Sequence, residues 1–303
     1  MIKGLDNPFF VTMRDGLEAA ARRQGVRITV QAAIGLQDTA GQASALESLT
    51  SEQAACYVVN PINATNLIQP LAQIPRGTPI VNIDSPVDRH AAMALGVGIT
   101  TYIGTDNIAA GRLAAAAMAR LVARGSRVAV IAGIPGDATS GARTEGFIEG
   151  ARGRFHVIQT IAADFDRRRA TLATTELLRS RTSIRGFFAV NDEMALGSAD
   201  AVRAVARGGK IAVIGVDGIP AALAAVKHGA ISATVAQYPY TIGQLAVEAC
   251  LAAIRRQAVP SRIDAPIQVV TPSDVARAQR DFPRPVGHFK DPLVRLLPSV
   301  NVR

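Results

Sequence analysis

Residues 186–217 read GFFAVNDEMALGSADAVRAVARGGKIAVIGVD. The two ends of this stretch, Gly186–Val190 and Ile211–Val216, are short and continuously apolar. Between them, Glu193–Ala206 has the apolar periodicity of an amphipathic helix. Continuous apolar runs are typical of parallel strands that are covered on both faces. The stretch therefore predicts a strand–helix–strand unit whose two strands are parallel.

The same alternation runs through the rest of the chain. Eight more apolar runs predict strands, at Ile28–Ala32, Ala55–Val59, Pro79–Ile83, Val97–Ile103, Arg127–Ala132, Val157–Ala162, Ile231–Ala236 and Ile267–Val270. Further helical patterns occupy Phe10–Arg23, Ile108–Ala123, Ala170–Leu178, Ala221–His228 and Ile242–Arg255. Because this is too many strands for one ordinary domain, we predict an α/β fold of two doubly wound lobes with parallel sheets.

Composition excludes several classes of protein. The chain has 303 residues, of which 49% are hydrophobic and 19% charged, so it can bury sizeable cores. No stretch approaches the about 18 apolar residues of a membrane-spanning helix. The net charge is +9, but the basic residues are scattered and the longest run is Arg167–Arg169. We therefore expect no nucleic-acid partner.

Motifs for catalysis, cofactors and metals are missing from the sequence. There is no phosphate-binding loop, no dinucleotide-binding glycine motif and no nucleophile elbow. Cys56 and Cys250 are predicted to be inert thiols. The histidines have no metal-ligand spacing; they are His90, His156, His228 and His288. We predict no catalytic residue, no cofactor and no metal site.

Polar residues cluster directly after the predicted strands. They are Asn60, Asp84, Asn191, Asp217 and Gln237. Ligands of open α/β sheets bind outside the carboxyl ends of the strands, so these residues are candidates for a common site. Each also has a local interpretation, since Asp and Asn form turns and Asn191 is placed to cap the following helix.

Aromatic and cationic residues complete the candidate set. Phe9 and Phe10 begin the first helix, and Phe165 lies in a polar loop, where it either staples that loop to the lobe or stacks on a ligand. Arg143 is predicted to lie at the start of a helix. The helix dipole makes this position unfavourable for a cation, so its presence there indicates a ligand role or an ion pair. Carboxylates, amides, an arginine and flat rings are the groups that a sugar requires.

Seven segments together carry a resemblance to a known family. They are LDNPFF (5–10), IGTDN (103–107), ARTEGF (142–147), ADFDR (163–167), NDEMALG (191–197), GVDG (215–218) and ATVAQYP (233–239). In this order and spacing they resemble the ribose-type periplasmic sugar-binding proteins, the ligand-capturing subunits of ABC importers. Single segments, such as NDEMALG, are shared with repressor effector domains.

The resemblance implies two flavodoxin-like lobes that are joined by three crossings and close on a ligand by hinge motion. The N-terminal lobe would comprise residues 1–104 and 238–266, and the C-terminal lobe residues 105–237 and 267–279. Residues 280–303 would form a proline-rich tail. The implied ligand-binding residues are Asn7, Phe9, Phe10, Asp84, Ser85, Arg143, Phe165, Asn191, Asp217 and Gln237. Phe10 and Phe165 would sandwich the sugar ring, and the polar residues would bind its hydroxyl groups.

Two departures from the family pattern bear on function. The ribose-binding pattern has an arginine directly after the aspartate of the N-terminal lobe, where this chain has Ser85. The shorter side chain favours another pentose, a hexose or a sugar alcohol as the ligand. Arg89 is the alternative source of a cation at this place. Family members also begin with a signal peptide and an apolar strand before the LDNPFF-like segment, and this chain has neither. A misplaced start codon, a shortened chain or a decayed gene would explain that difference.

The resemblance implies a non-catalytic monomer that binds a monosaccharide or polyol outside the cytoplasm and delivers it to a membrane ABC permease. The main alternative is the effector domain of a lac-repressor-like regulator without its helix-turn-helix. Two further hypotheses are an enzyme on an α/β scaffold and a protein that presents a ligand to a chemoreceptor.

Overall fold

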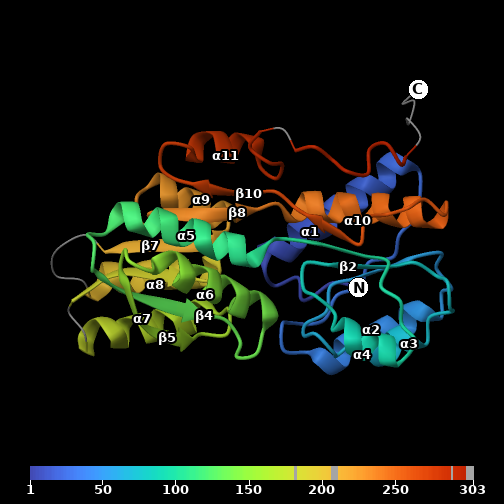
Figure 1. Cartoon of the computed structure of the whole chain (residues 1–303), viewed down its shortest axis with the longest axis horizontal. Coiled ribbons are helices and arrows are strands. Elements are labelled where there is room, and N and C mark those ends of the chain that lie inside the picture. The colour runs from blue at the N-terminus through green and yellow to red at the C-terminus, as the bar shows by residue number, and fades with distance from the viewer. Residues whose placement is uncertain (181–182, 206–210, 288, 298–303) are drawn as a thin grey trace. The chain divides into compact units, whose positions relative to one another are not determined.

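The computed structural model describes residues 1–180, 183–205, 211–287 and 289–297, which form two compact units (Figure 1). Unit 1 comprises Met1–Thr105, Pro239–Ala265 and the described part of Gly287–Arg303. Unit 2 comprises Asp106–Tyr238 and Pro266–Val286. Each unit therefore combines segments that lie far apart in the sequence.

Unit 1 is built on a parallel sheet of four strands in the order β1-β2-β3-β9. The strands are β1 (Tyr57–Val59), β2 (Ile80–Ile83), β3 (Thr101–Gly104) and β9 (Arg262–Asp264). The helices are α1 (Pro8–Gln24), α2 (Thr39–Thr50), α3 (Ile68–Ala72), α4 (Arg89–Ala94) and α10 (Pro239–Ile254). Figure 1 shows α1 and α10 on one side of β2 and α2 to α4 on the other.

Local sequence explains where the helices of unit 1 begin and how they pack. Asn7 caps α1 by accepting a hydrogen bond from the N–H of Phe9, and Pro8 fits the first helical position. Asp38 and Asp88 cap α2 and α4 in the same way. Helices α1 and α10 approach closely at Gly16, where a Cβ atom would collide with the carbonyl group of Tyr240.

Unit 2 is built on a sheet of six strands in the order β10-β8-β7-β6-β4-β5. The strands are β4 (Arg127–Ala132), β5 (His156–Ala162), β6 (Ile184–Ala189), β7 (Ala212–Asp217), β8 (Ala233–Gln237) and β10 (Ile267–Val270). The helices are α5 (Asn107–Leu121), α6 (Ala138–Ala151), α7 (Arg167–Ser180), α8 (Asp192–Val205), α9 (Pro220–Lys227) and α11 (Val275–Asp281). All neighbouring strands are parallel except β10, which pairs antiparallel to β8.

The predicted α/β class with two largely parallel sheets is confirmed. The predicted strand at Ile28–Ala32 is wrong, because the only bridge there joins Ile2 and Ala32. A strand needs a neighbour along its length, and in this part of unit 1 the parallel neighbour consists of Met1 and Ile2 alone. Periodicity also missed β9 and the helices α2, α3, α4 and α11.

The end of the chain is less extended than expected. Arg280 and Asp281 belong to α11, and Leu293 is fully buried. The expectations for Ala206, His288 and Pro298 lie outside the described residues. Within the described part, no helix is both long and apolar enough to cross a membrane.

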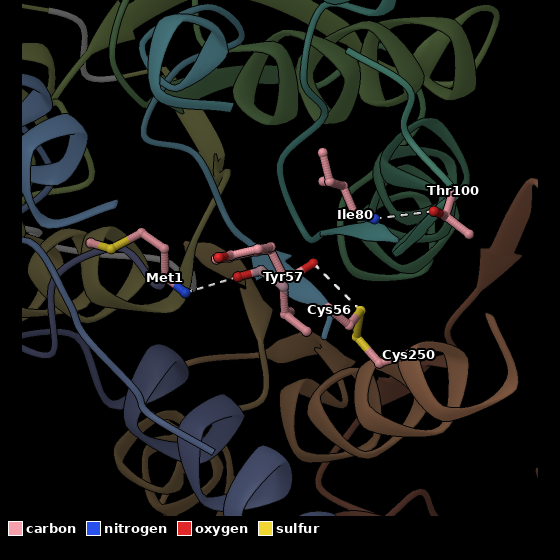
Figure 2. Close-up of a disulfide and its surroundings, with 7 residues drawn as sticks. Met1, Cys56, Tyr57, Ile80, Thr100 and Cys250 are labelled. Atoms are coloured by element: carbon pink, nitrogen blue, oxygen red, sulfur yellow. Dashed lines mark hydrogen bonds between the residues drawn. A yellow bond between two sulfur atoms is a disulfide. The ribbon is translucent and has the colours of Figure 1, made fainter. Parts of the chain in front are cut away.

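A disulfide joins Cys56 and Cys250, so the prediction of two inert thiols is wrong (Figure 2). Cys56 directly precedes β1, and Cys250 lies on α10, which packs against β1. Their Cα atoms are 5.8 Å apart although the residues are separated by 194 positions. The distance suits a disulfide, and only the packing of α10 on the sheet brings the two residues together.

Candidate functional site

Asp84 and Ser85 follow β2 in unit 1, at the carboxyl end of the strand. The Asp84 backbone has a φ of 60°, which few non-glycine residues adopt. The Tyr102 hydroxyl donates to the Asp84 carbonyl oxygen at 2.6 Å, and the Asp84 N–H donates to the Ile103 carbonyl oxygen at 2.9 Å. These two bonds hold the unusual backbone conformation in place, and with it the buried carboxylate of Asp84.

Lys3 reaches the same position from the start of the chain. Its Nζ atom donates to the Ser85 Oγ atom at 2.6 Å and lies 5.7 Å from the centre of the Phe10 ring. Only 6% of the surface of Lys3 is exposed. The Ser85 hydroxyl is also 3.4 Å from the Asp84 carboxylate. The structure therefore places the buried amino group of Lys3 beside Ser85 and Asp84. The cation at this place is neither an arginine at position 85 nor Arg89.

The two predicted aromatic residues of unit 1 lie at the N-terminal end of α1. Phe9 and Phe10 are buried and pack edge to face, with ring centres 5.3 Å apart. Because Asn7 caps the same helix, all three predicted residues are held at one end of α1. Lys3 joins them to Asp84 and Ser85, so the unit 1 residues form one group. Asn60 is different, because it is fully buried with its amide 3.8 Å from the Met13 sulfur.

Asn191, Asp217 and Gln237 lie at the carboxyl ends of β6, β7 and β8, which are adjacent in the sheet of unit 2. The Gln237 amide donates to the Asp217 carboxylate at 2.7 Å. Asn191 accepts from the N–H of Met194 at 3.0 Å, so it caps α8 as the local interpretation proposed. All three side chains are buried. The structure thus places three of the five residues predicted from their positions after strands at the ends of adjacent strands of unit 2, and it places Asn60 and Asp84 in unit 1.

Arg143 lies in the second turn of α6, so the prediction that it opens that helix is wrong. Asp137 provides the cap, six residues earlier. Arg143 is 5% exposed; it donates to the Asn107 side chain at 2.8 Å and to the Val190 carbonyl oxygen at 2.7 Å. Its guanidinium is 3.6 Å from the Asp217 carboxylate. A buried cation held this firmly directs its other donors at fixed positions.

Asp192 holds the backbone that follows Asp217 in place. Its carboxylate accepts from the N–H of Gly218 at 2.6 Å and of Ile219 at 3.0 Å, and from the Thr234 hydroxyl at 2.7 Å. Burial raises the pKa of Asp192 to about 6, against the opposing effect of these bonds and of Arg143. These bonds hold the turn that follows Asp217. The backbone of Asp217 itself has a φ of 133°, which is rare for a non-glycine residue.

Phe165 lies in the loop between β5 and α7, at a φ of 61°. Its ring packs on Gly133, where a Cβ atom would collide with it. The side chain remains half-buried. The ring is thus attached to the carboxyl end of β4, as the loop-staple interpretation proposed, and it keeps an accessible portion for stacking.

Sequence reasoning missed Lys3, Asn107 and Asp192. A detectable signal for Lys3 was its rarity, since the chain has four lysines and this one stands in the apolar start MIKG. Asn107 closes the IGTDN segment and Asp192 follows Asn191, so both are parts of quoted motifs. In the described parts of the chain, no group of three or more His, Cys, Asp or Glu residues is arranged to hold a metal ion. The residues described above offer hydrogen bonding and ring stacking.

Comparison with known proteins identifies a matching family. A family model described as a periplasmic binding protein domain matches residues 1–258. The ribose import binding protein RbsB of Bacillus subtilis is 33% identical over 271 residues, which is 89% of this chain and 85% of that protein. The D-allose-binding periplasmic protein of Escherichia coli is 33% identical over 247 residues, covering 80% of this chain and 79% of that protein.

A solved structure shares the fold. It is an ABC transporter periplasmic solute binding protein from Actinobacillus succinogenes with bound D-allose. It matches with a TM-score of 0.85 and 29% sequence identity, over 91% of this chain and 97% of that chain. The overlap therefore extends over both units of the fold.

Proposed function

This chain belongs to the periplasmic binding protein domain family, as its match over residues 1–258 shows, and from that premise we propose that it binds a monosaccharide and delivers it to a membrane ABC permease. The binding is non-catalytic. The named relatives are import or binding proteins, which favours this role over that of a transcription regulator.

One observation carries the proposal. Arg143, Asp217 and Gln237 form a buried, hydrogen-bonded group at the carboxyl ends of adjacent strands. A carboxylate, an amide and a guanidinium offer both acceptors and donors, as neighbouring sugar hydroxyls require.

Unit 1 supplies the second half of the proposed binding set. Asp84 provides a carboxylate, Lys3 and Ser85 provide donors, and Phe10 provides a flat apolar surface. Phe10 and Phe165 would each offer a flat apolar surface for the C–H face of a sugar ring. We propose that Lys3 acts as the cationic donor of unit 1.

The substrate class that suits this set is an aldose of five or six carbons. The named relatives bind ribose or D-allose. Ser85 is shorter than the arginine of the ribose-binding pattern, and Lys3 restores one charged donor there. We propose a ribose- or allose-like sugar.

The disulfide supports a location outside the cytoplasm. Disulfides persist in oxidising compartments such as the periplasm and are rare in the cytosol. The relatives named periplasmic agree with this location. We propose that the protein works at the extracytoplasmic side of the membrane that holds its permease.

Thermal unfolding in the presence of sugars tests the proposal. The panel comprises ribose, allose, arabinose, fucose and a sugar alcohol at millimolar concentration. A ligand at about 1,000 times its dissociation constant stabilises the folded state by about 4 kcal/mol, which raises the midpoint by roughly 10 °C. We expect a rise of this size with one or two aldoses.

Asp217→Asn identifies the site in the same assay. The substitution keeps the size of the side chain but removes its charge, so the affinity should fall by about 10- to 100-fold. Asp200→Asn is the matched control, because Asp200 is a partly exposed residue of α8 that pairs with Arg167. Equal shifts for Asp217→Asn and the parent, or no shift with any aldose, would contradict the proposal.

A further inference from the structure

Six exposed arginines gather at the amino edge of the sheet of unit 2, the edge opposite to the carboxyl ends of β6, β7 and β8. They are Arg120, Arg124, Arg127, Arg152, Arg154 and Arg185. These residues are scattered along the sequence, but α5 and α6 end at this edge, and β4, β5 and β6 begin there. Parallel strands with helical crossovers bring helix ends and strand starts to the same side of a sheet. The six arginines are called the basic edge below.

Backbone pairing holds the segments of the basic edge next to one another. The Gly125 N–H donates to the Arg154 carbonyl oxygen at 2.8 Å, which joins the loop before β4 to the loop before β5. Arg127, the first residue of β4, lies in register with His156 of β5 and with Ile184 of β6. The starts of these three strands and the loops before β4 and β5 therefore form one continuous part of the surface.

Carboxylates do not balance this charge. Neither Asp nor Glu occurs in residues 120–127, 152–156 and 183–185. Elsewhere on unit 2, the exposed Arg112 pairs with Glu149 at 2.8 Å. Among the residues that the structure describes, no carboxylate forms an ion pair with an arginine of the basic edge. Glu176 lines a hollow together with Arg127 but does not pair with it.

Helix dipoles explain only a small part of this placement. Arg120 lies in the last turn of α5, where a cation is favourable. Arg124 and Arg154 lie in loops, and Arg127 and Arg185 lie at the starts of neighbouring strands. Like charges on neighbouring strands repel one another. An anionic partner that spans the edge would remove this repulsion.

The side chains at this edge suit a lipid surface that carries phosphate groups. All six cations are arginines, and a guanidinium group binds phosphate oxygens through two parallel hydrogen bonds. Leu121 ends α5 and is 43% exposed, and Ile148 lies in the last turn of α6 and is 40% exposed. Exposed aliphatic side chains among basic ones fit the headgroup region of a membrane. Nucleic acids favour exposed aromatic rings for stacking, whereas Phe155 at this edge is buried.

We propose that the basic edge is a docking surface for an anionic phospholipid membrane. Arginine–phosphate contacts hold the protein there, and Leu121 and Ile148 enter the headgroup region. The residues of unit 2 that are proposed to bind sugar lie at the opposite edge of the same sheet, so membrane contact does not involve them. The inference goes beyond the proposed function and does not depend on it.

Co-sedimentation of the full chain with lipid vesicles tests the proposal. The vesicles contain phosphatidylcholine alone or phosphatidylcholine mixed with the anionic phosphatidylglycerol. We expect binding to the anionic vesicles to be about tenfold or more tighter than to the neutral ones. Binding should weaken as salt is added, because ions screen the attraction between the arginines and the lipid phosphates.

Two triple variants of equal net charge locate the surface. One removes three arginines of the basic edge: Arg124→Gln, Arg154→Gln, Arg185→Gln. The other removes three exposed arginines of unit 1: Arg22→Gln, Arg76→Gln, Arg255→Gln. We expect the first to bind anionic vesicles about tenfold or more weakly than the parent, and the second to bind like the parent. Equal thermal midpoints of the first variant and the parent show that the variant is folded.

Three results would overturn the proposal. They are equal binding of the two triple variants, equal binding to neutral and anionic vesicles, and binding of duplex DNA as tight as that of anionic vesicles. Leu121→Ser separates lipid from other polyanions, because it should weaken binding to vesicles and leave any binding to DNA unchanged. No sugar is present in these measurements, so their outcome is independent of the proposed function.

Discussion

The Nζ atom of Lys3 lies 2.6 Å from the Oγ atom of Ser85, although 82 positions separate the two residues. The ribose-binding pattern has an arginine at position 85, where this chain has a serine. The amino group of Lys3 therefore supplies a positive charge beside this position. Lys3 also lies above the ring of Phe10. The contact joins the start of the chain, the first helix and the end of β2 into one group.

Lys3→Met should weaken sugar binding by about 10- to 100-fold. The substitution keeps an unbranched side chain of similar length but removes the charged donor, and a hydrogen bond to a charged group contributes about 1.5–3 kcal/mol. Titration calorimetry with the sugar that gives the largest thermal shift measures the loss. Lys227→Met is the control, because Lys227 is exposed on α9. Unchanged affinity in Lys3→Met would exclude Lys3 from the binding set.

Asp192→Asn should weaken binding without direct contact to the sugar. The amide has one oxygen for three donors, and its NH₂ group faces an N–H or a hydroxyl, so the turn after Asp217 loses support. We expect about tenfold weaker binding and faster hydrogen exchange at Gly218 and Ile219 in the sugar-free protein.

The exchange measurement separates positioning from other effects of this substitution. Asp200→Asn, on the same helix, should change neither affinity nor exchange at Gly218. Weaker binding of Asp192→Asn with unaltered exchange at Gly218 and Ile219 would argue against a positioning role.

Glu248 should make unit 1 less stable as the pH rises. Burial raises its pKa from 4.5 to about 7, nearby Asp291 adds to this effect, and Arg23 opposes it. Between these values the folded state binds more protons than the unfolded state, so the free energy of unfolding falls as the pH increases from about 4.5 to 7. A shift of this size changes the free energy of unfolding by about 3 kcal/mol.

Glu248→Gln should remove that dependence. We expect the variant to be more stable than the parent at pH 8 and to lose this advantage near pH 5, as measured by thermal midpoints across the range. Glu18→Gln is the control, because Glu18 is a partly exposed residue of α1. A difference between Glu248→Gln and the parent that does not vary with pH would refute the assignment.

The disulfide should contribute about 2–5 kcal/mol to the stability of unit 1, because it closes a loop of 194 positions in the unfolded chain. The double variant Cys56→Ser, Cys250→Ser should therefore unfold at a lower temperature. A thiol assay on the denatured, unreduced parent should detect no reactive thiol among the two cysteines. Two reactive thiols, or an unchanged midpoint in the double variant, would count against a disulfide in the folded protein.

The class of fold was determined by the sequence alone, because burial on both faces imposes a local pattern. Runs such as Gly186–Val190 are apolar throughout since helices cover both sides of the strand. Residues that follow such strands share one edge of a parallel sheet, so Asn191, Asp217 and Gln237 could be grouped without coordinates. These inferences need only the order of elements along the chain.

Tertiary structure alone decided which distant residues meet. Lys3 meets Ser85, and Cys56 meets Cys250, because helices and strands pack in a particular arrangement that no local periodicity encodes. The same reason explains the failure at Ile28–Ala32, whose composition favours a strand but whose only bridge is at Ala32. A strand forms through its neighbours, and the identity of a neighbour is a property of the folded chain.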